Sequence, residues 1–242
     1  MKAPAQAPLA PVYSWTGFYV GGHVGALQTR TNGRFDPLPD VPFFGIFPIS
    51  GDLNKTAFVG GLHAGYNWQF APSWVGGIEA DWSWTDAKGS FTQPWVSILG
   101  NAVRPTALTS MSMGPDWLAT VRGRIGYLIT PSALLYFTGG AAWADVKYAA
   151  SANNEPARPD RYISSASFSR TASGYVLGGG LEWAFWSNWS VRAEYLFYRL
   201  NTGTTVAVSP TDTVLFPPPL GSRFSWSDTD LHAVRVGASY RF

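Results

Sequence analysis

Apolar and polar side chains alternate along the last twelve residues of the chain, Leu231–Phe242. Val234 and Val236 fall on one face of an extended segment. Arg235 and Arg241 fall on the other. Because successive side chains of a β-strand point to opposite faces, the segment predicts a strand with one apolar and one polar side. A strand of a transmembrane barrel has this division, with its apolar side toward lipid and its polar side toward the lumen.

The same alternation recurs in seven other segments. The predicted strands cover residues 15–30, 55–70, 74–87, 114–129, 133–148, 170–185, 189–201 and 228–242. Short breaks suited to hairpin turns fall at residues 71–73, 130–132 and 186–188. Long breaks rich in Pro, Ser, Thr and Asn cover residues 31–54, 88–112, 150–169 and 202–227. Strict alternation of short and long connections predicts an all-β fold: an eight-stranded antiparallel transmembrane β-barrel with short periplasmic turns and four long extracellular loops.

A soluble β-sandwich could use the same alternation, with the apolar faces as its core. The aromatic side chains argue against it, because many of them gather near the short-turn end, where a membrane interface would favour them. These are Tyr66, Trp68, Phe70, Trp74, Tyr127, Phe185, Trp186, Trp189, Tyr240 and Phe242. The distribution therefore favours a barrel in the outer membrane of a Gram-negative bacterium.

The composition supports a partly non-aqueous environment. The chain is 46% hydrophobic and 16% aromatic but only 13% charged, which is little charge for a soluble surface. The longest nearly apolar run, residues 133–144, is shorter than the roughly 18 residues of a membrane-spanning helix. The sequence has no Cys, which excludes disulfides and thiolate metal sites. A net charge of +2 without a basic cluster indicates no nucleic-acid partner.

The beginning of the chain differs from the rest. Residues 1–14 are rich in Ala and Pro, and we expect a periplasmic N-terminal segment there, ahead of a barrel domain over residues 15–242. This segment has no apolar core of a secretory signal, so we expect the signal peptide to lie outside this numbering.

The residues that the alternation places on the inward faces of the strands include charged side chains of both signs. The predicted lumen network comprises Glu79, Asp81, Arg122, Arg124, Asp145, Lys147, Glu182, Arg192, Glu194, Arg235 and Arg241. Segment 133–148 is ambiguous, because both of its faces begin apolar, and only its outer half suggests that Asp145 and Lys147 point inward. An eight-stranded barrel has a lumen that side chains can fill, so these charges predict a salt-bridged plug and little conductance. Dense carboxylates could also indicate glycosidase acids, but the plug is the favoured interpretation.

Three motifs carry a family resemblance: residues 13–22 (YSWTGFYVGG), 60–68 (GGLHAGYNW) and 236–242 (VGASYRF). They resemble the small outer-membrane immunogenic proteins of alphaproteobacteria, which belong to the OmpA-like β-barrel superfamily and are often called a porin family. The resemblance implies an envelope-structural protein, a surface antigen, a weak porin or a haem binder. It also implies that Tyr240 and Phe242 form the aromatic ending that the outer-membrane insertion machinery recognises.

Catalysis is not predicted. Outer-membrane lipid A acylases and deacylases, the enzymes to consider by resemblance, place a His with Ser or Asp near the outer rim. His232 has Ser227 and Asp230 nearby, but no local motif sets a nucleophile beside it.

A ligand site is the other alternative. His23 and His63 share inward parity on neighbouring strands and could bind haem, a metal or another small ligand. Hydrogen-bonded lumen histidines explain the same pattern, and we predict no cofactor.

The long loops contain apolar stretches at residues 41–47 and 214–220, which either mark a partner site or pack on each other. We therefore predict a non-catalytic envelope-structural and surface-interaction role, with a narrow porin or a haem-binding or small-ligand receptor as alternatives. The expected partners are outer-membrane lipid and lipopolysaccharide, the insertion machinery, and a second copy or an envelope partner through the loops.

Overall fold

The computed structural model describes residues 13–38, 48–99, 102–153, 163–209 and 221–242. Its strands are β1 (Gly17–Arg30), β2 (Asn32–Leu38), β3 (Ile49–Asp52), β4 (Lys55–Ala71), β5 (Trp74–Thr85), β6 (Gly89–Leu99), β7 (Ala102–Thr130), β8 (Ala133–Asn153), β9 (Ile163–Ala184), β10 (Trp189–Leu200), β11 (Thr204–Val208), β12 (Gly221–Trp226) and β13 (Thr229–Arg241). In these ranges there is no helix long and apolar enough to cross a membrane.

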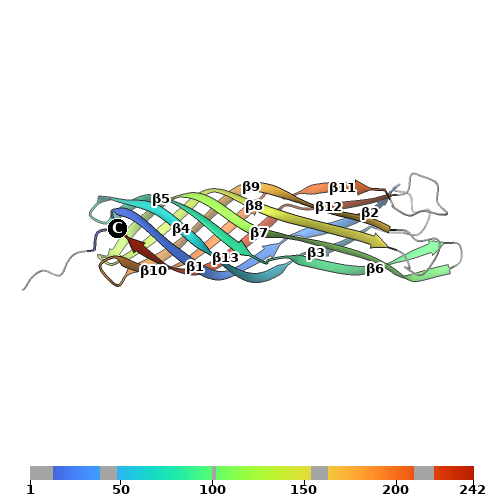
Figure 1. Ribbon diagram of the computed structural model, residues 1–242, viewed down its shortest axis with the longest axis horizontal. Coiled ribbons are helices and arrows are strands. Elements are labelled where there is room, and N and C mark those ends of the chain that lie inside the picture. The colour runs from blue at the N-terminus through green and yellow to red at the C-terminus, as the bar shows by residue number, and fades with distance from the viewer. Residues whose placement is uncertain (1–12, 39–47, 100–101, 154–162, 210–220) are drawn as a thin grey trace, which may run out of the picture.

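Eight of these strands close a barrel. The antiparallel pairs run β1–β4, β4–β5, β5–β7, β7–β8, β8–β9, β9–β10, β10–β13 and back from β13 to β1. The short turns β4–β5, β7–β8 and β9–β10 lie at one end of the barrel together with the C-terminus (Figure 1). The predicted fold class, the strand positions and the short turns are therefore confirmed.

The predicted long loops are wrong in extent, because much of their sequence is β-strand. The strands β11, β12, β2 and β3 form a separate four-stranded sheet in that order, and β6 pairs with the first half of β7. Pro residues hid this structure from sequence analysis. They are tolerated because Pro94 lies in the outermost strand of its sheet and Pro115 lies at a register shift of β7. The apolar stretches 41–47 and 214–220, and residues 1–12 of the N-terminal segment, lie outside the described residues.

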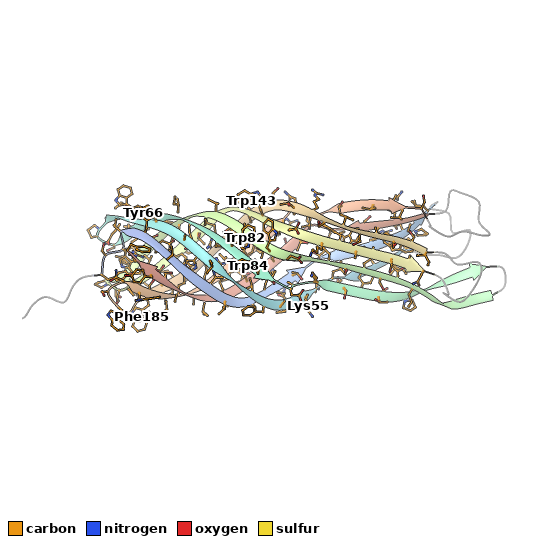
Figure 2. All side chains as sticks on the ribbon, in the orientation of Figure 1. Lys55, Tyr66, Trp82, Trp84, Trp143 and Phe185 are labelled. Carbon is orange, nitrogen blue, oxygen red and sulfur yellow. The ribbon has the colours of Figure 1, made fainter. Side chains whose placement is uncertain are left out.

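The outer wall is apolar in the half of the barrel that carries the short turns. Phe58, Ile78 and Phe137 are each exposed by more than 65% of their surface. Aromatic side chains flank this zone at two levels: Tyr66 and Phe185 lie at the turn end, and Trp82, Trp84 and Trp143 lie nearer the middle of the molecule (Figure 2). A lipid-facing band between two aromatic belts is typical of a transmembrane barrel. The structure therefore has the predicted aromatic belt at the turn end and a second aromatic belt nearer the middle of the molecule.

Beyond the second belt the two sides of the wall exchange character. In β8, Phe137 faces outward in the lower half, whereas in the upper half Val146 and Tyr148 are buried and Lys147 is exposed. The enclosed upper interior is an apolar core whose larger members are Leu27, Phe35, Leu53, Val59, Met111, Met113, Leu118, Val146, Tyr148, Val176, Leu196, Tyr198, Leu200, Phe224, Trp226 and Leu231. The strands thus form a membrane-spanning half and an extracellular half with its own hydrophobic core.

Candidate functional site

Charged side chains fill the interior at the membrane-spanning level. The nine that meet there are Glu79 and Asp81 from β5, Arg122 and Arg124 from β7, Glu182 from β9, Arg192 and Glu194 from β10, and Arg235 and Arg241 from β13. All nine are buried, and we call them the ionic layer. Their inward position follows from strand parity, because the opposite face of each strand contacts lipid.

Glu79 is the most heavily paired carboxylate of the layer. Its Oε1 accepts a hydrogen bond from Arg122, and its Oε2 accepts one from Arg192. The Arg124 guanidinium lies 3.7 Å away, and the Tyr19 hydroxyl donates to Oε2 at 2.8 Å. One carboxylate therefore neutralises guanidinium groups from two strands, β7 and β10, that are not neighbours in the barrel.

Arg235 and Arg122 connect the other carboxylates of the upper part of the layer. Arg235 lies 3.1 Å from Asp81 and 2.7 Å from Glu194. Arg122 lies 3.2 Å from Asp81 and 2.9 Å from Glu194. Two arginines and two carboxylates thus form a closed ring across the lumen. Because each buried charge has a partner of opposite sign, the cost of removing it from water is offset.

The periplasmic end of the layer is closed by the beginning of the chain. The Arg241 guanidinium lies 5.1 Å from the ring centres of both Tyr13 and Trp15, and 3.8 Å from Glu182. Trp15 is fully buried, and its Nε1 donates to the carbonyl of Pro131 at 3.0 Å. Trp15, which the alternation predicts as the first strand residue, precedes β1 and turns into the barrel mouth.

Asp145 and Lys147 do not join the ionic layer, and their predicted inward position is wrong. Lys147 is exposed on the outer wall, where it forms an ion pair with Asp116, and Asp116 also lies 3.2 Å from Lys88. The hydrogen bond from Lys147 lowers the pKa of the Asp116 carboxyl below its usual value. Both predicted residues lie in the upper half of β8, where water surrounds the wall, so the buried positions there are apolar.

His23 and His63 meet inside the barrel. Their rings stack with centroids 5.7 Å apart and Nδ1 atoms 3.4 Å apart. The other ring nitrogens contact hydroxyls, His23 Nε2 that of Ser83 at 2.8 Å and His63 Nε2 that of Ser239 at 2.9 Å. All four ring nitrogens are therefore in hydrogen-bond contact within the protein.

Two glycines make room for this pair. A Cβ atom at Gly21 would overlap the His63 ring, and one at Gly61 would lie 2.9 Å from His23 Nε2. Over the described ranges there is no group of three or more His, Asp or Glu side chains that could hold a metal ion. The geometry favours hydrogen-bonded lumen histidines.

His232 lies on the outer wall, apart from both other histidines. Its Nδ1 contacts the Tyr195 hydroxyl at 2.7 Å. Asp230 pairs with Arg199 at 3.4 Å, and the Ser227 hydroxyl donates to the carbonyl of Asp228 at 3.2 Å. The His, Ser and Asp considered for catalysis are thus each engaged with other groups.

Three hydroxyl donors belong to the ionic layer and are absent from the predicted lumen network. Thr120 donates to Asp81, Ser190 donates to Glu182 at 2.7 Å, and Tyr136 donates to Glu194 at 3.2 Å. The parity of each strand places these residues inward, so parity could have identified them.

The terminal aromatic pair lies at the periplasmic end of the outer wall. The rings of Tyr240 and Phe242 are 5.3 Å apart, and Phe242 is 73% exposed. The Phe242 amide still donates to the carbonyl of Phe18 at 3.0 Å, so the strand pairing continues to the last residue.

The family model and the sequence relatives agree with this architecture. A family model described as the outer membrane protein beta-barrel domain matches residues 1–242. The chain is 31% identical over 246 residues to the 31 kDa outer-membrane immunogenic protein of Brucella melitensis, covering 100% of this chain and 89% of that protein. It is 29% identical over 206 residues to the 22 kDa outer membrane protein of Rhizobium leguminosarum, covering 82% and 74%. Among solved structures, the outer membrane protein OprG of Pseudomonas aeruginosa aligns with a TM-score of 0.49 and 13% identity, covering 94% of this chain and 97% of OprG.

Proposed function

We propose, from the premise that this chain belongs to the outer membrane protein β-barrel domain family, that it is a non-catalytic envelope-structural protein with a closed interior and a surface-contact role. The family match places the protein in the outer membrane, and the relatives support the resemblance of the three sequence motifs. The observation that carries the proposal is the double filling of the interior: the ionic layer lies below and the apolar core lies above.

The two fillings act in series. An ion that enters from the periplasm meets paired charges around Glu79 and Arg122. An ion that enters from outside meets the apolar core around Phe224 and Trp226, which offers it almost no solvation. Either filling is a barrier, so an opening in one of them leaves the other in place.

Planar bilayer recordings test the closed interior. The wild-type protein is expected to give no stable ohmic conductance. The Arg192→Ala variant, which opens only the ionic layer, is expected to remain closed as well. A large, stable conductance of the wild-type protein contradicts the proposal and favours the narrow-porin alternative.

The surface-contact role is supported by the extracellular half. Its strands extend well beyond Trp82, Trp84 and Trp143 of the upper aromatic belt (Figure 2). The Brucella relative carries the name of an outer-membrane immunogenic protein. We propose that the extracellular half of this chain is accessible at the cell surface. Antibodies raised against residues 163–173 should label intact cells, and labelling only after the cells are lysed would contradict the proposal.

The contacts of His232, Ser227 and Asp230 with other groups support the non-catalytic role, and those of the two lumen histidines support the lack of haem binding. The hydrogen-bond contacts of His23 and His63 within the protein leave no ring nitrogen directed at a ligand. Titration with haem is expected to leave its Soret band unshifted. A shift that disappears in a His23→Ala/His63→Ala variant would overturn this part of the proposal.

Tyr240 and Phe242 are proposed as the signal for the insertion machinery. Both rings are accessible on the outer wall while the backbone of Phe242 is paired with β1. A Phe242→Ser variant is expected to accumulate in the periplasm, whereas Phe185→Ser, which removes a similar exposed ring, should insert normally. Equal insertion of both variants would contradict this role.

A further inference from the structure

A row of charged side chains crosses the outer wall just above the membrane-spanning zone. Arg30 of β1 and Arg199 of β10 flank Asp230 of β13 in register. Arg199 contacts Asp230 at 3.4 Å and is 49% exposed, and Arg30 is also exposed. Arg30 donates to Gln28 Oε1 at 3.3 Å. The row holds two arginines and one carboxylate, so it has an excess of positive charge. This excess serves neither the ionic layer nor the apolar core, because the row is on the opposite side of the wall.

Polarity falls quickly below this row. The next register row holds Gln28, His232 and Phe197. The row below it holds Ala26, Val234 and Tyr195. The three rows change from charged through amphipathic to apolar side chains. This change marks the level at which lipid headgroups meet acyl chains.

An apolar trough with a volume of about 1300 Å³ begins directly beneath these rows. Its floor is made of small or β-branched side chains and of glycine: Gly22, Val24, Gly60, Ala193, Val236 and Ala238. Bulkier side chains form its two walls, Phe58, Leu62 and Trp84 on one side and Leu181, Trp183 and Val191 on the other. The trough is therefore a depression in an otherwise convex barrel surface, open to the bilayer.

We propose that this outer wall binds one phosphorylated lipid of the outer leaflet, with its phosphate at Arg30 and Arg199 and an acyl chain in the trough. Arginine pairs with phosphate through two parallel hydrogen bonds. Most of the trough lining is apolar, with Thr85 and Asp86 among its polar residues, and this lining suits a hydrocarbon chain. A lipid with an anionic headgroup has both a phosphate for the arginines and a hydrocarbon chain for the trough.

The dimensions agree with this occupant. From Arg30 to Gly22 the strand runs eight residues, about 27 Å at 3.4 Å per residue. With a strand tilt of about 40°, this corresponds to about 20 Å along the membrane normal. One leaflet of hydrocarbon is about 15 Å thick. The height from the arginine row to the far edge of the trough is therefore comparable to one leaflet of hydrocarbon, and the trough occupies the lower part of that height.

Native mass spectrometry of the full chain in mild detergent tests the site, with diphosphorylated lipid A as the probe. The wild-type protein should retain one molecule of lipid A. Dephosphorylated lipid A and inorganic phosphate, which lack one half of the ligand each, should both bind at least about tenfold more weakly, equivalent to about 1.4 kcal/mol.

Two variants separate the halves of the site. The Arg30→Gln/Arg199→Gln protein should lose the preference for the phosphorylated lipid. The Gly22→Leu protein should lose retention of either lipid, because the new side chain fills the trough. A Cβ atom at Gly22 meets its nearest neighbour at 3.6 Å, so the barrel can accommodate the substitution. Lys147→Gln and Ala141→Leu make the matched changes on the outer wall of β8 and should bind as the wild type does.

Three results would overturn the proposal. The first is equal binding of phosphorylated and dephosphorylated lipid A. The second is lipid retention that is unchanged in Gly22→Leu, provided that the variant keeps the heat-modifiable migration of a folded barrel. The third is a wild-type dimer that Gly22→Leu dissociates without any change in bound lipid, which would assign the trough to a second copy of the chain. None of these results depends on whether the interior conducts ions.

Discussion

Around Glu79 the interior of the barrel holds guanidinium groups and carboxylates in contact, whereas around Trp226 it holds Met113, Tyr148 and Phe224. Several of the same strands build both regions, and β7 and β8 run through the two without a break. What differs is the medium outside the wall. Where the wall faces lipid, its apolar side chains point outward and the polar ones are enclosed. Where it faces water, the arrangement reverses.

This change between the two halves shows that the enclosed face of a strand can be either polar or apolar, depending on the medium outside the wall. In the lower half the charged side chains are enclosed because lipid accepts only the apolar face, and a small enclosed apolar cluster of Trp15, Val75, Leu134, Tyr136 and Ala184 lies next to the short turns. In the upper half the hydrophobic effect acts as in a soluble protein and encloses the apolar face. In β7 a register shift between Pro115 and Trp117 moves the enclosed positions from Met111 and Met113 to Thr120 and Arg122.

Removal of one charge from the ionic layer should have the largest effect. A Glu79→Gln variant leaves Arg122, Arg124 and Arg192 without their shared carboxylate. We expect a loss of about 3–5 kcal/mol in the free energy of unfolding, because buried charges without a partner are costly. Reversible urea unfolding of the folded barrel in lipid measures the change. A loss below about 1 kcal/mol would show that water already solvates the layer.

A cavity in the apolar core should cost somewhat less and should act locally. Leu118 is buried, and Leu118→Ala is expected to lower stability by about 3 kcal/mol. Hydrogen exchange should become faster at amides of the extracellular half while the amides around Glu79 remain protected. Equal acceleration in both halves would show that the two regions unfold as one unit.

Tyr148 gives the apolar core a pH dependence above pH 10. Burial raises the pKa of its hydroxyl to about 12, and this hydroxyl donates to the carbonyl of Thr202 at 2.8 Å. Since the pKa is raised in the folded state, the stability that it contributes is present below pH 10 and is lost as the pH rises toward 12. The Tyr148→Phe variant should lose about 1 kcal/mol at neutral pH.

The difference between wild type and Tyr148→Phe should then shrink between pH 10 and pH 12. Urea unfolding of both proteins across this range measures it. A difference that stays constant over the range would contradict a buried phenol at this position.

The smallest effect is expected for the ion pair outside the wall. Lys147 is about half exposed and pairs with Asp116 in water, so Lys147→Gln should cost about 0–1 kcal/mol. The same loss of one charge is therefore expected to cost several times more at Glu79 than at Lys147. A cost at Lys147 as large as that at Glu79 would remove the distinction between the two sides of the wall.

The sequence was sufficient to predict the barrel, its strands and most of the ionic layer, because period-two alternation is strong wherever lipid covers one face. It was insufficient for the extracellular half, where Asp145 and Lys147 were assigned to the wrong side. Alternation alone does not state which medium surrounds a strand, so the parity rule was carried past the upper aromatic belt. The contacts of Trp15 and Tyr13 with Arg241 also escaped prediction, since they join the beginning of the chain to its end.

The reversal along β8 can be measured residue by residue. The chain has no native Cys, so spin labels can be attached at single Cys variants of Phe137, Val146, Lys147 and Ser151 without interference. In lipid bilayers, the label at position 137 should collide with oxygen, and labels at 147 and 151 should collide with a water-soluble nickel complex. The label at 146 should collide with neither. Nickel access at 146, or oxygen contact at 151 as strong as that at 137, would contradict a closed barrel whose outer wall changes from apolar to polar at the membrane surface.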